Sequence, residues 1–135
     1  MARALGIGGV FFKSDDVQAL GEWYKKWLGV PYGQWGASFN PAEVPATAWH
    51  VWSPFKADTE YFAPSDSNYM VNLIVDDLDG ALAQVREGGA QVMEEIDESE
   101  YGRFGWFIDP AGVKIELWQP PETRPADVLG EGPED

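Results

Sequence analysis

The feature that most constrains this chain is a pattern that occurs twice, 61 residues apart. In each copy an apolar, β-prone segment is followed by two aspartates, at 15–16 and at 76–77, and then by an amphipathic stretch that ends at glycine. Paired aspartates before an apolar periodicity are typical of helix N-caps, and glycine is typical of helix C-termini. The pattern therefore predicts helices over 16–28 and 78–87, each at the same place in a duplicated module.

Short apolar segments bounded by glycine, proline or polar residues surround both predicted helices. The last two segments form a hairpin, because Pro110-Ala111-Gly112 is a turn sequence. The whole chain is interpreted as strand, helix and three strands, written twice. The predicted strands are 6–13, 30–40, 46–53, 69–75, 90–96, 102–109 and 113–118, and the acidic run 97–100 is expected to be a solvated loop.

Charge and composition exclude several classes of function. The 135 residues suit one domain, and 23 acidic against 9 basic residues give a net charge of −14. Such a surface repels nucleic acid and anionic membranes. The absence of cysteine excludes disulfides, thiolate zinc sites and a cysteine nucleophile. No apolar run reaches the ~18 residues of a membrane span and no signal peptide is evident, so we expect a cytoplasmic protein.

The last hairpin carries the most specific resemblance to a known family. Residues 109–117, DPAGVKIEL, resemble the D-P-x-G-x-x-I-E-L ending of the vicinal oxygen chelate superfamily, which includes glyoxalases, bleomycin-resistance proteins and extradiol dioxygenases. The sequences VDDL at 75–78 and YGRF at 101–104 support it, as does Tyr24 with Leu28-Gly29 at the end of the first helix. The resemblance covers roughly residues 5–119.

This resemblance implies an α+β fold of two βαβββ modules, at 5–60 and 69–119, within one domain over 5–119. The modules would form one curved, mixed, eight-stranded sheet around a cavity, with the helices outside. Members of this size are usually homodimers, and the cavity is often completed across the interface. Residues 120–135 form an acidic, proline-rich C-terminal tail.

Metal-dependent members of the superfamily place four ligand positions on the inner strands. Carried over one at a time, these positions fall on Gly9, on Met70, on Glu116 and near His50 to Trp52. Glycine offers no ligand, and a thioether is a poor ligand for hard or borderline divalent ions. At most Glu116 and His50 remain, whereas a catalytic site needs about three protein ligands. We therefore expect no metal cofactor.

Strand alternation assigns a face to Glu116 in the last predicted strand. Val113, Ile115 and Leu117 share the face that should meet the helix, so Glu116 faces the cavity together with Lys114 and Trp118. A carboxylate in a tryptophan-lined cavity is suited to holding a cation. The alternative is a carboxylate paired with Lys114 or Arg103, or retained without a metal.

The other candidate residues have two readings each. Asn72, which shares a face with Met70, either orients a ligand or makes a cross-strand hydrogen bond. Arg103 either binds a ligand anion or pairs with nearby glutamates at 94, 95, 98 or 100. His50 is a general base or lone ligand, or else a half-exposed strand residue. Three tryptophans are either ligand-stacking rings or core: Trp52, Trp106 and Trp118.

The leading hypothesis is a metal-independent protein that sequesters a neutral or cationic aromatic molecule. The rival is a metal-dependent lyase, isomerase or dioxygenase of the glyoxalase type that uses Glu116 and His50. Metal-free acid–base catalysis by the same pair, and an accessory module that binds another protein, stay open.

Overall fold

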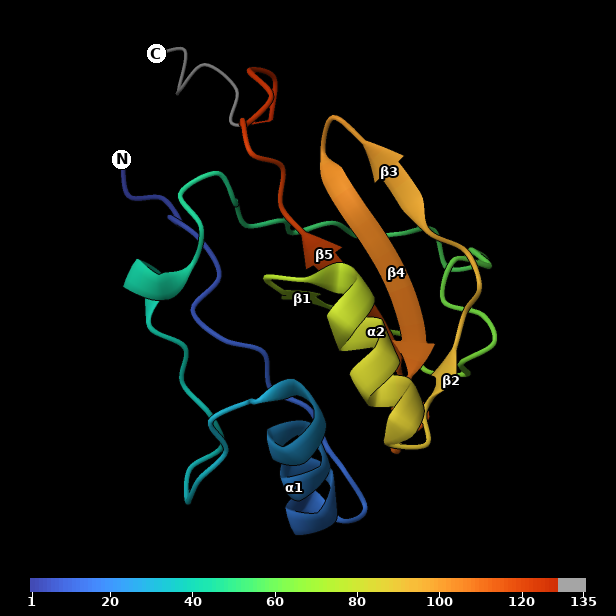
Figure 1. Cartoon of the computed structure of the whole chain (residues 1–135). Helices are drawn as coiled ribbons and strands as arrows, with labels where there is room; N and C mark the ends of the chain where they lie inside the picture. The colour runs from blue at the N-terminus through green and yellow to red at the C-terminus, as the bar shows by residue number, and fades with distance from the viewer. Residues whose placement is uncertain (129–135) are drawn as a thin grey trace.

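The computed structural model describes residues 1–128 of the chain (Figure 1). Within these residues it contains two α-helices, a short 3-10 helix and one mixed sheet of five strands. An α+β architecture is therefore confirmed. The elements in chain order are α1 (Val17–Leu28), η1 (Pro41–Glu43), β1 (Val71–Ile74), α2 (Leu78–Glu87), β2 (Gln91–Val92), β3 (Asp97–Ser99), β4 (Gly102–Ile108) and β5 (Lys114–Gln119).

Both helices begin where the paired aspartates predict. The Asp16 carboxylate accepts a hydrogen bond from the backbone N–H of Ala19 at 3.0 Å, and the Asp77 carboxylate accepts one from Gly80 at 3.1 Å. Each bond satisfies a donor that the first helical turn leaves without a partner. Helix α1 ends at Gly29, whose φ of 64° lies in the left-handed region that glycine adopts without strain.

The strand order in the sheet is β1-β5-β4-β2, and β3 pairs with β4. Strands β1 and β5 are parallel, and the other pairs are antiparallel. The β4–β5 hairpin turns where the sequence predicts, because the Asp109 carboxylate accepts hydrogen bonds from the backbone of Ala111 and Val113 at 2.9 and 3.0 Å. Gly112 supplies a φ of 83° in the same turn.

The core lies between α2 and one face of the sheet. Its fully buried members are Leu78 and Val85 from α2, Phe107 from β4 and Leu117 from β5. Gly105 allows the close approach, because a Cβ there would lie 2.8 Å from the side chain of Leu82. This arrangement confirms that the apolar residues of the last strand meet the helix.

Helix α1 packs against this core through polar anchors as well as apolar contacts. The Trp23 indole N–H donates to the carbonyl oxygen of Gly88 at 2.9 Å, and its ring lies 5.9 Å from that of Phe107. The Tyr24 hydroxyl donates to the buried Asp109 carboxylate at 2.7 Å. Burial, followed by the charge of Asp109, raises the pKa of Tyr24.

The structure differs from the expected eight-stranded sheet in the first half of the chain. The segments predicted as strands at 6–13, 30–40 and 46–53 are not strands, and among residues 1–70 β-pairing is limited to an isolated bridge between Gly33 and Gly36. A strand needs a ladder partner, and these segments find none within the described chain. Two modules around a cavity are therefore not observed in the single chain.

The acidic run at 97–100 is a second difference, because three of its residues form β3. Asp97, Glu98 and Ser99 pair with Phe104, Arg103 and Gly102 of β4. All three β3 side chains are exposed, so the backbone pairs while the charges remain in water. The prediction of a simple loop was wrong because charge alone does not prevent an edge strand.

The residues that follow β5 contact two other parts of the chain, Ala46 and Tyr101 just before β4. The Arg124 guanidinium donates to the backbone carbonyl of Ala46, and the Tyr101 hydroxyl donates to Asp127 at 3.0 Å. Residues 120–128 of the predicted tail thus lie against the body, and residues 129–135 are outside the described part. Neither described helix is long and apolar enough to cross a membrane.

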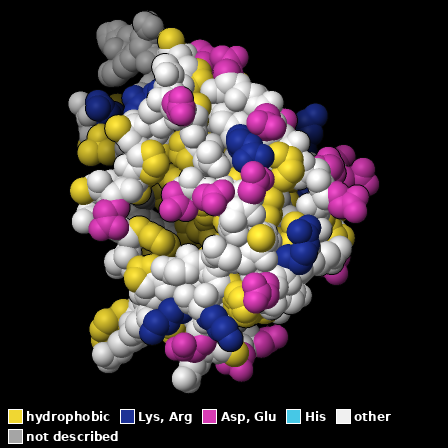
Figure 2. All heavy atoms as spheres, in the orientation of Figure 1, with side chains coloured by type: hydrophobic (Ala, Val, Ile, Leu, Met, Phe, Trp, Pro, Cys, Tyr) yellow, Lys and Arg dark blue, Asp and Glu magenta, His cyan; other side chains and the backbone are white. Residues whose placement is uncertain are grey.

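Large hydrophobic side chains are exposed mainly in the first half. Figure 2 shows the molecule in the orientation of Figure 1, with acidic side chains scattered over the visible surface. Hydrophobic side chains lie along the left margin, which is the side of the N-terminal segments in Figure 1. Within residues 1–128, thirteen of the fourteen large hydrophobic residues that are exposed precede residue 62, which separates the two halves sharply. The most exposed members of this group besides Met1 are Phe11, Trp35, Leu5 and Trp52.

Candidate functional site

The candidate site lies on the face of the sheet opposite α2. The strand register places Asn72 of β1, Glu116 of β5 and Trp106 of β4 side by side in one row. Because their neighbours in each strand face the core, all three side chains point away from the helix. Sequence alternation predicted this face for Glu116 and Asn72.

The Glu116 carboxylate is the centre of a hydrogen-bond cluster. Its Oε1 accepts from the amide of Asn72 at 2.6 Å, and its Oε2 accepts from the Trp106 indole N–H at 2.9 Å and from the Tyr61 hydroxyl at 2.6 Å. All three donors are neutral, so among residues 1–128 this carboxylate has no ion-pair partner. Hydrogen bonds to a charged group are worth about 1.5–3 kcal/mol each, which fixes the row firmly.

Tyr61 covers this cluster from the segment that crosses the open face of the sheet. Its ring meets Trp106 edge-on, with centroids 6.2 Å apart and planes at 84°. Lys114 Nζ lies 5.3 Å from the Tyr61 ring centroid and donates to the Tyr61 carbonyl at 2.7 Å. Burial, followed by the hydrogen bond to Glu116, raises the pKa of Tyr61 and keeps its hydroxyl protonated.

A second, purely aromatic cluster adjoins the first on the same face. Trp118 stacks on Phe104 with centroids 6.1 Å apart, and Trp49 meets Trp118 edge-on at 4.7 Å. The Trp118 indole N–H donates to the backbone carbonyl of Tyr101 at 2.8 Å. Aromatic rings therefore gather on the face that the sequence predicted to line a cavity.

The remaining predicted ligand-facing residues lie elsewhere. Met70 lines a pocket of about 650 Å³ formed by the segment 53–70. Trp52 is 80% exposed, and the exposed His50 accepts a hydrogen bond from the backbone of Ile7 at 3.1 Å. The row around Glu116 does not line that pocket, so the structure brings together only part of the predicted set.

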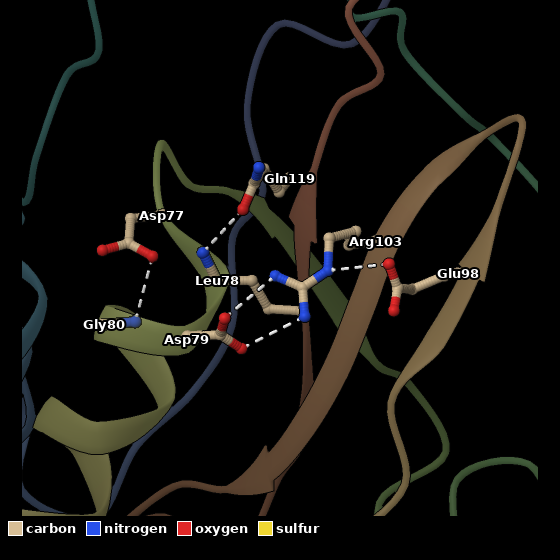
Figure 3. Close-up of polar contacts among 7 residues, drawn as sticks. All are labelled: Asp77, Leu78, Asp79, Gly80, Glu98, Arg103 and Gln119. Atoms are coloured by element: carbon tan, nitrogen blue, oxygen red, sulfur yellow. Dashed lines mark hydrogen bonds and ion pairs between the residues drawn. The ribbon is translucent and has the colours of Figure 1, made fainter.

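Arg103 lies on the other side of β4, toward the start of α2 (Figure 3). Its guanidinium pairs with Asp79 at 3.2 Å and with Glu98 at 3.3 Å, and both partners are largely exposed. The hydrogen bond to Asp79 and the charges of both acids raise the pKa of Arg103. Figure 3 also shows the Gln119 side chain accepting from the backbone N–H of Leu78. Pairing with a nearby glutamate was predicted, whereas pairing with Asp79 was not.

The residues at the superfamily's metal positions do not fit a divalent ion in this chain. Both oxygens of Glu116 already accept hydrogen bonds, and His50 Nδ1 is bonded to the backbone of Ile7. Within residues 1–128, no three acidic or histidine side chains lie close enough together to hold one ion. A metal would need ligands from outside this set.

Sequence reasoning missed Tyr61 and Trp49 as members of the site. Tyr61 lies in the segment 54–68, between the predicted strands 46–53 and 69–75, where the sequence predicts no helix or strand. A signal was nevertheless present, because this connection carries Phe55, Tyr61 and Phe62. Three aromatic rings in a short loop indicate that the loop packs on something, and here their rings lie 5.3–6.4 Å from one another.

Comparison with known proteins supports the family. The family model described as a glyoxalase-like domain matches residues 9–118. No curated protein sequence matches the chain. The solved structure VPC_CASS1, from the mobile metagenome of V. Pseudocholerae, is 20% identical with a TM-score of 0.50, and the match covers 87% of this chain and 98% of that one. It supports the fold alone.

Two further solved structures resemble the chain more loosely. TnmS3, an antibiotic binding protein from Streptomyces sp. CB03234, is 22% identical with a TM-score of 0.48, over 87% of this chain and 99% of that one. A glyoxalase/bleomycin resistance protein/dioxygenase from Nocardioides is 18% identical with a TM-score of 0.47, over 87% of this chain and 84% of that one.

Proposed function

The chain belongs to the glyoxalase-like domain family, and from this premise we propose that it is a small-molecule-binding protein that sequesters an aromatic ligand without a metal ion. The family scaffold serves many chemistries, so the site must carry the argument. The observation that carries it is the row of Asn72, Glu116 and Trp106 beside the rings of Phe104 and Trp118. An aromatic wall with few polar groups is the usual form of a ligand site.

The position of the Lys114 ammonium bears on the charge of the ligand. Its ammonium lies 5.3 Å from the Tyr61 ring centroid and 5.7 Å from that of Trp106, so it already fills the position that a ligand cation would take over these rings. This favours a neutral aromatic ligand. A cationic one is the alternative, because the net charge of −14 attracts cations over a longer range.

We propose further that the protein works as a homodimer. Segments predicted as strands in the first half lack ladder partners, and they expose Val10, Phe11, Val51 and Trp52. Exposed apolar side chains gathered in one part of a chain mark an interaction surface. A second copy offers these segments both the strand partners and the apolar cover that the single chain does not provide.

Tryptophan fluorescence tests the binding function. Coumarin, a neutral bicyclic probe, and N-methylquinolinium, a cationic one of similar size, are titrated into the protein with EDTA present. We expect saturable quenching by coumarin, with about fivefold weaker binding to Trp106→Phe and unchanged binding to the control Trp35→Phe, since Trp35 is 91% exposed. Saturable binding of neither probe would contradict the proposal.

Metal analysis separates this function from the metal-dependent alternative. The protein is purified without chelator and then offered Mn²⁺, Ni²⁺ and Zn²⁺. We expect substoichiometric metal that does not differ between the wild type and Glu116→Ala. Stoichiometric metal that is lost in Glu116→Ala would establish a chelate site and redirect the search toward glyoxalase-type reactions.

A further inference from the structure

We propose that the spot beneath Tyr61 is a subsite for the hydroxyl-bearing ring of a phenolic ligand, which Tyr61 occupies as a tethered stand-in until the ligand displaces it. The subsite is formed by Glu116, Asn72, Trp106 and Lys114. This inference rests on the proposed binding function and names the chemical class of the ligand.

Every part of the Tyr61 phenol has a matched contact. The hydroxyl donates to Glu116 Oε2 at 2.6 Å, the ring meets the Trp106 ring at 84°, and the Lys114 ammonium lies over the ring at 5.3 Å. The subsite therefore reads a donor hydroxyl and an aromatic ring together, as a phenol presents them. An aliphatic alcohol would lack the ring contacts, and an aromatic hydrocarbon would lack the hydroxyl.

The carboxylate remains poised for a hydroxyl when Tyr61 leaves. Glu116 keeps the bonds from Asn72 and Trp106, which hold its oxygens in place, and it regains a free acceptor site on Oε2. A phenolate or a carboxylate ligand would be repelled there by the charge of Glu116. A ligand ammonium would compete with Lys114 for the ring faces, so a neutral phenol fits best.

Tyr61 differs from Tyr24, another tyrosine whose hydroxyl donates to a carboxylate of the second half of the chain. Tyr24 lies in α1 and its partner Asp109 is only 7% exposed, so that pair is part of the core. Tyr61 is 40% exposed and lies in a segment without helix or strand. Its neighbours Glu60 and Phe62 line the 650 Å³ pocket, so open space adjoins this segment, and the displacement of Tyr61 is part of the proposal.

Chemical rescue tests the subsite directly. Tyr61→Ala removes the tethered ring, and p-cresol supplies the same ring and hydroxyl in free form, whereas toluene supplies the ring alone. Binding is followed by NMR through the indole N–H resonance of Trp106, which donates to Glu116. We expect p-cresol to bind Tyr61→Ala at least about tenfold more tightly than toluene does, and at least about tenfold more tightly than it binds the wild type.

Two further variants make the test decisive. Tyr101→Ala is the matched control, because Tyr101 also donates to a carboxylate, that of Asp127, but outside this cluster. It should bind p-cresol with the affinity of the wild type. Tyr61→Phe keeps the ring and loses the hydroxyl, so its p-cresol affinity should fall between those of the wild type and Tyr61→Ala; it carries the test if Tyr61→Ala does not fold.

Equal affinities for p-cresol and toluene, or equal p-cresol affinities in the wild type and in the Tyr61 variants, would overturn the subsite. If coumarin still quenches the tryptophans in that case, the binding function stands and only the phenol subsite fails. If the wild type shows saturable binding of neither coumarin nor N-methylquinolinium, the proposed function is overturned as well.

Discussion

The two halves of this molecule differ in what they do with their hydrophobic residues. Residues 71–119 form a sheet and a helix that bury Phe107, Leu117 and Val85 completely. Residues 1–61 carry apolar and aromatic side chains at a comparable density, yet within the described chain only Leu20 of this half is buried. Because the two halves have a similar density of apolar residues and share a sequence pattern, composition does not explain why the second half buries so many more of them.

The pairing of β-strands explains why the second half buries its apolar residues and the first half mostly does not. Each strand of the second half finds a partner close in sequence or in the parallel β1–β5 pair, and Asp109 closes the hairpin between β4 and β5. Segments 6–13 and 46–53 lack such local partners. Strands that are close in sequence can pair within one chain. A segment without a nearby partner strand depends on a partner from elsewhere, and we propose that a second copy of the chain supplies it.

The largest expected effect tests where the stability of the molecule resides. Phe107→Ala removes a fully buried ring between α2 and the sheet and should lower the free energy of unfolding by about 3–5 kcal/mol. Trp35→Ala, at a side chain that is 91% exposed, should change it by less than about 0.5 kcal/mol. Urea denaturation followed by circular dichroism measures both. Similar losses would show that the halves are equally packed.

The next prediction tests the proposed dimer. Phe11→Ser removes a 94% exposed ring from the first half and should weaken self-association about tenfold or more, as measured by light scattering across a dilution series. Ile96→Ser is the matched control, because Ile96 is the exposed large hydrophobic residue of the second half. A monomer at every concentration in the wild type would contradict the dimer.

Sequence reasoning succeeded where structure depends on local chemistry. Caps, turns and alternation are encoded within a few residues, so the helix starts at Asp16 and Asp77, the turn at Asp109 and the outward face of Glu116 were predictable. The partners of Glu116 were less so, since Tyr61 reaches it across 55 residues of sequence. The segments 6–13, 30–40 and 46–53 are not strands in the described chain, because strand pairing requires partners that no local sequence pattern specifies.

A smaller effect on stability should come from the hydrogen bond between Tyr24 of α1 and Asp109 of the second half. Tyr24→Phe deletes the hydrogen bond to Asp109 and leaves a buried carboxylate with one partner fewer, which should cost about 1–2 kcal/mol. The pH dependence supplies a signature. Because burial raises the pKa of Tyr24 above its unfolded value of about 10, the folded state binds more protons there, and stability should fall as the pH rises above about 10.

Tyr24→Phe should make that alkaline loss less steep, because a phenylalanine has no proton to lose. Tyr61→Phe should do the same to a lesser extent, since the pKa of Tyr61 is also raised but its side chain is 40% exposed. Urea titrations at pH 8, 9, 10 and 11 measure the slope. An unchanged slope in Tyr24→Phe would show that α1 is not held to the second half through Asp109.

The smallest expected effect concerns Arg103, which has the most conspicuous ion pairs of the second half. Its partners Asp79 and Glu98 are 73% and 67% exposed, so water and salt screen both contacts. Arg103→Met keeps the apolar stem and should leave the free energy of unfolding nearly unchanged. Binding of coumarin should not change, because Arg103 faces α2 and not the row of Glu116. A large loss of coumarin affinity in this variant would place the ligand on the α2 side of the sheet and would contradict the proposed site around Glu116.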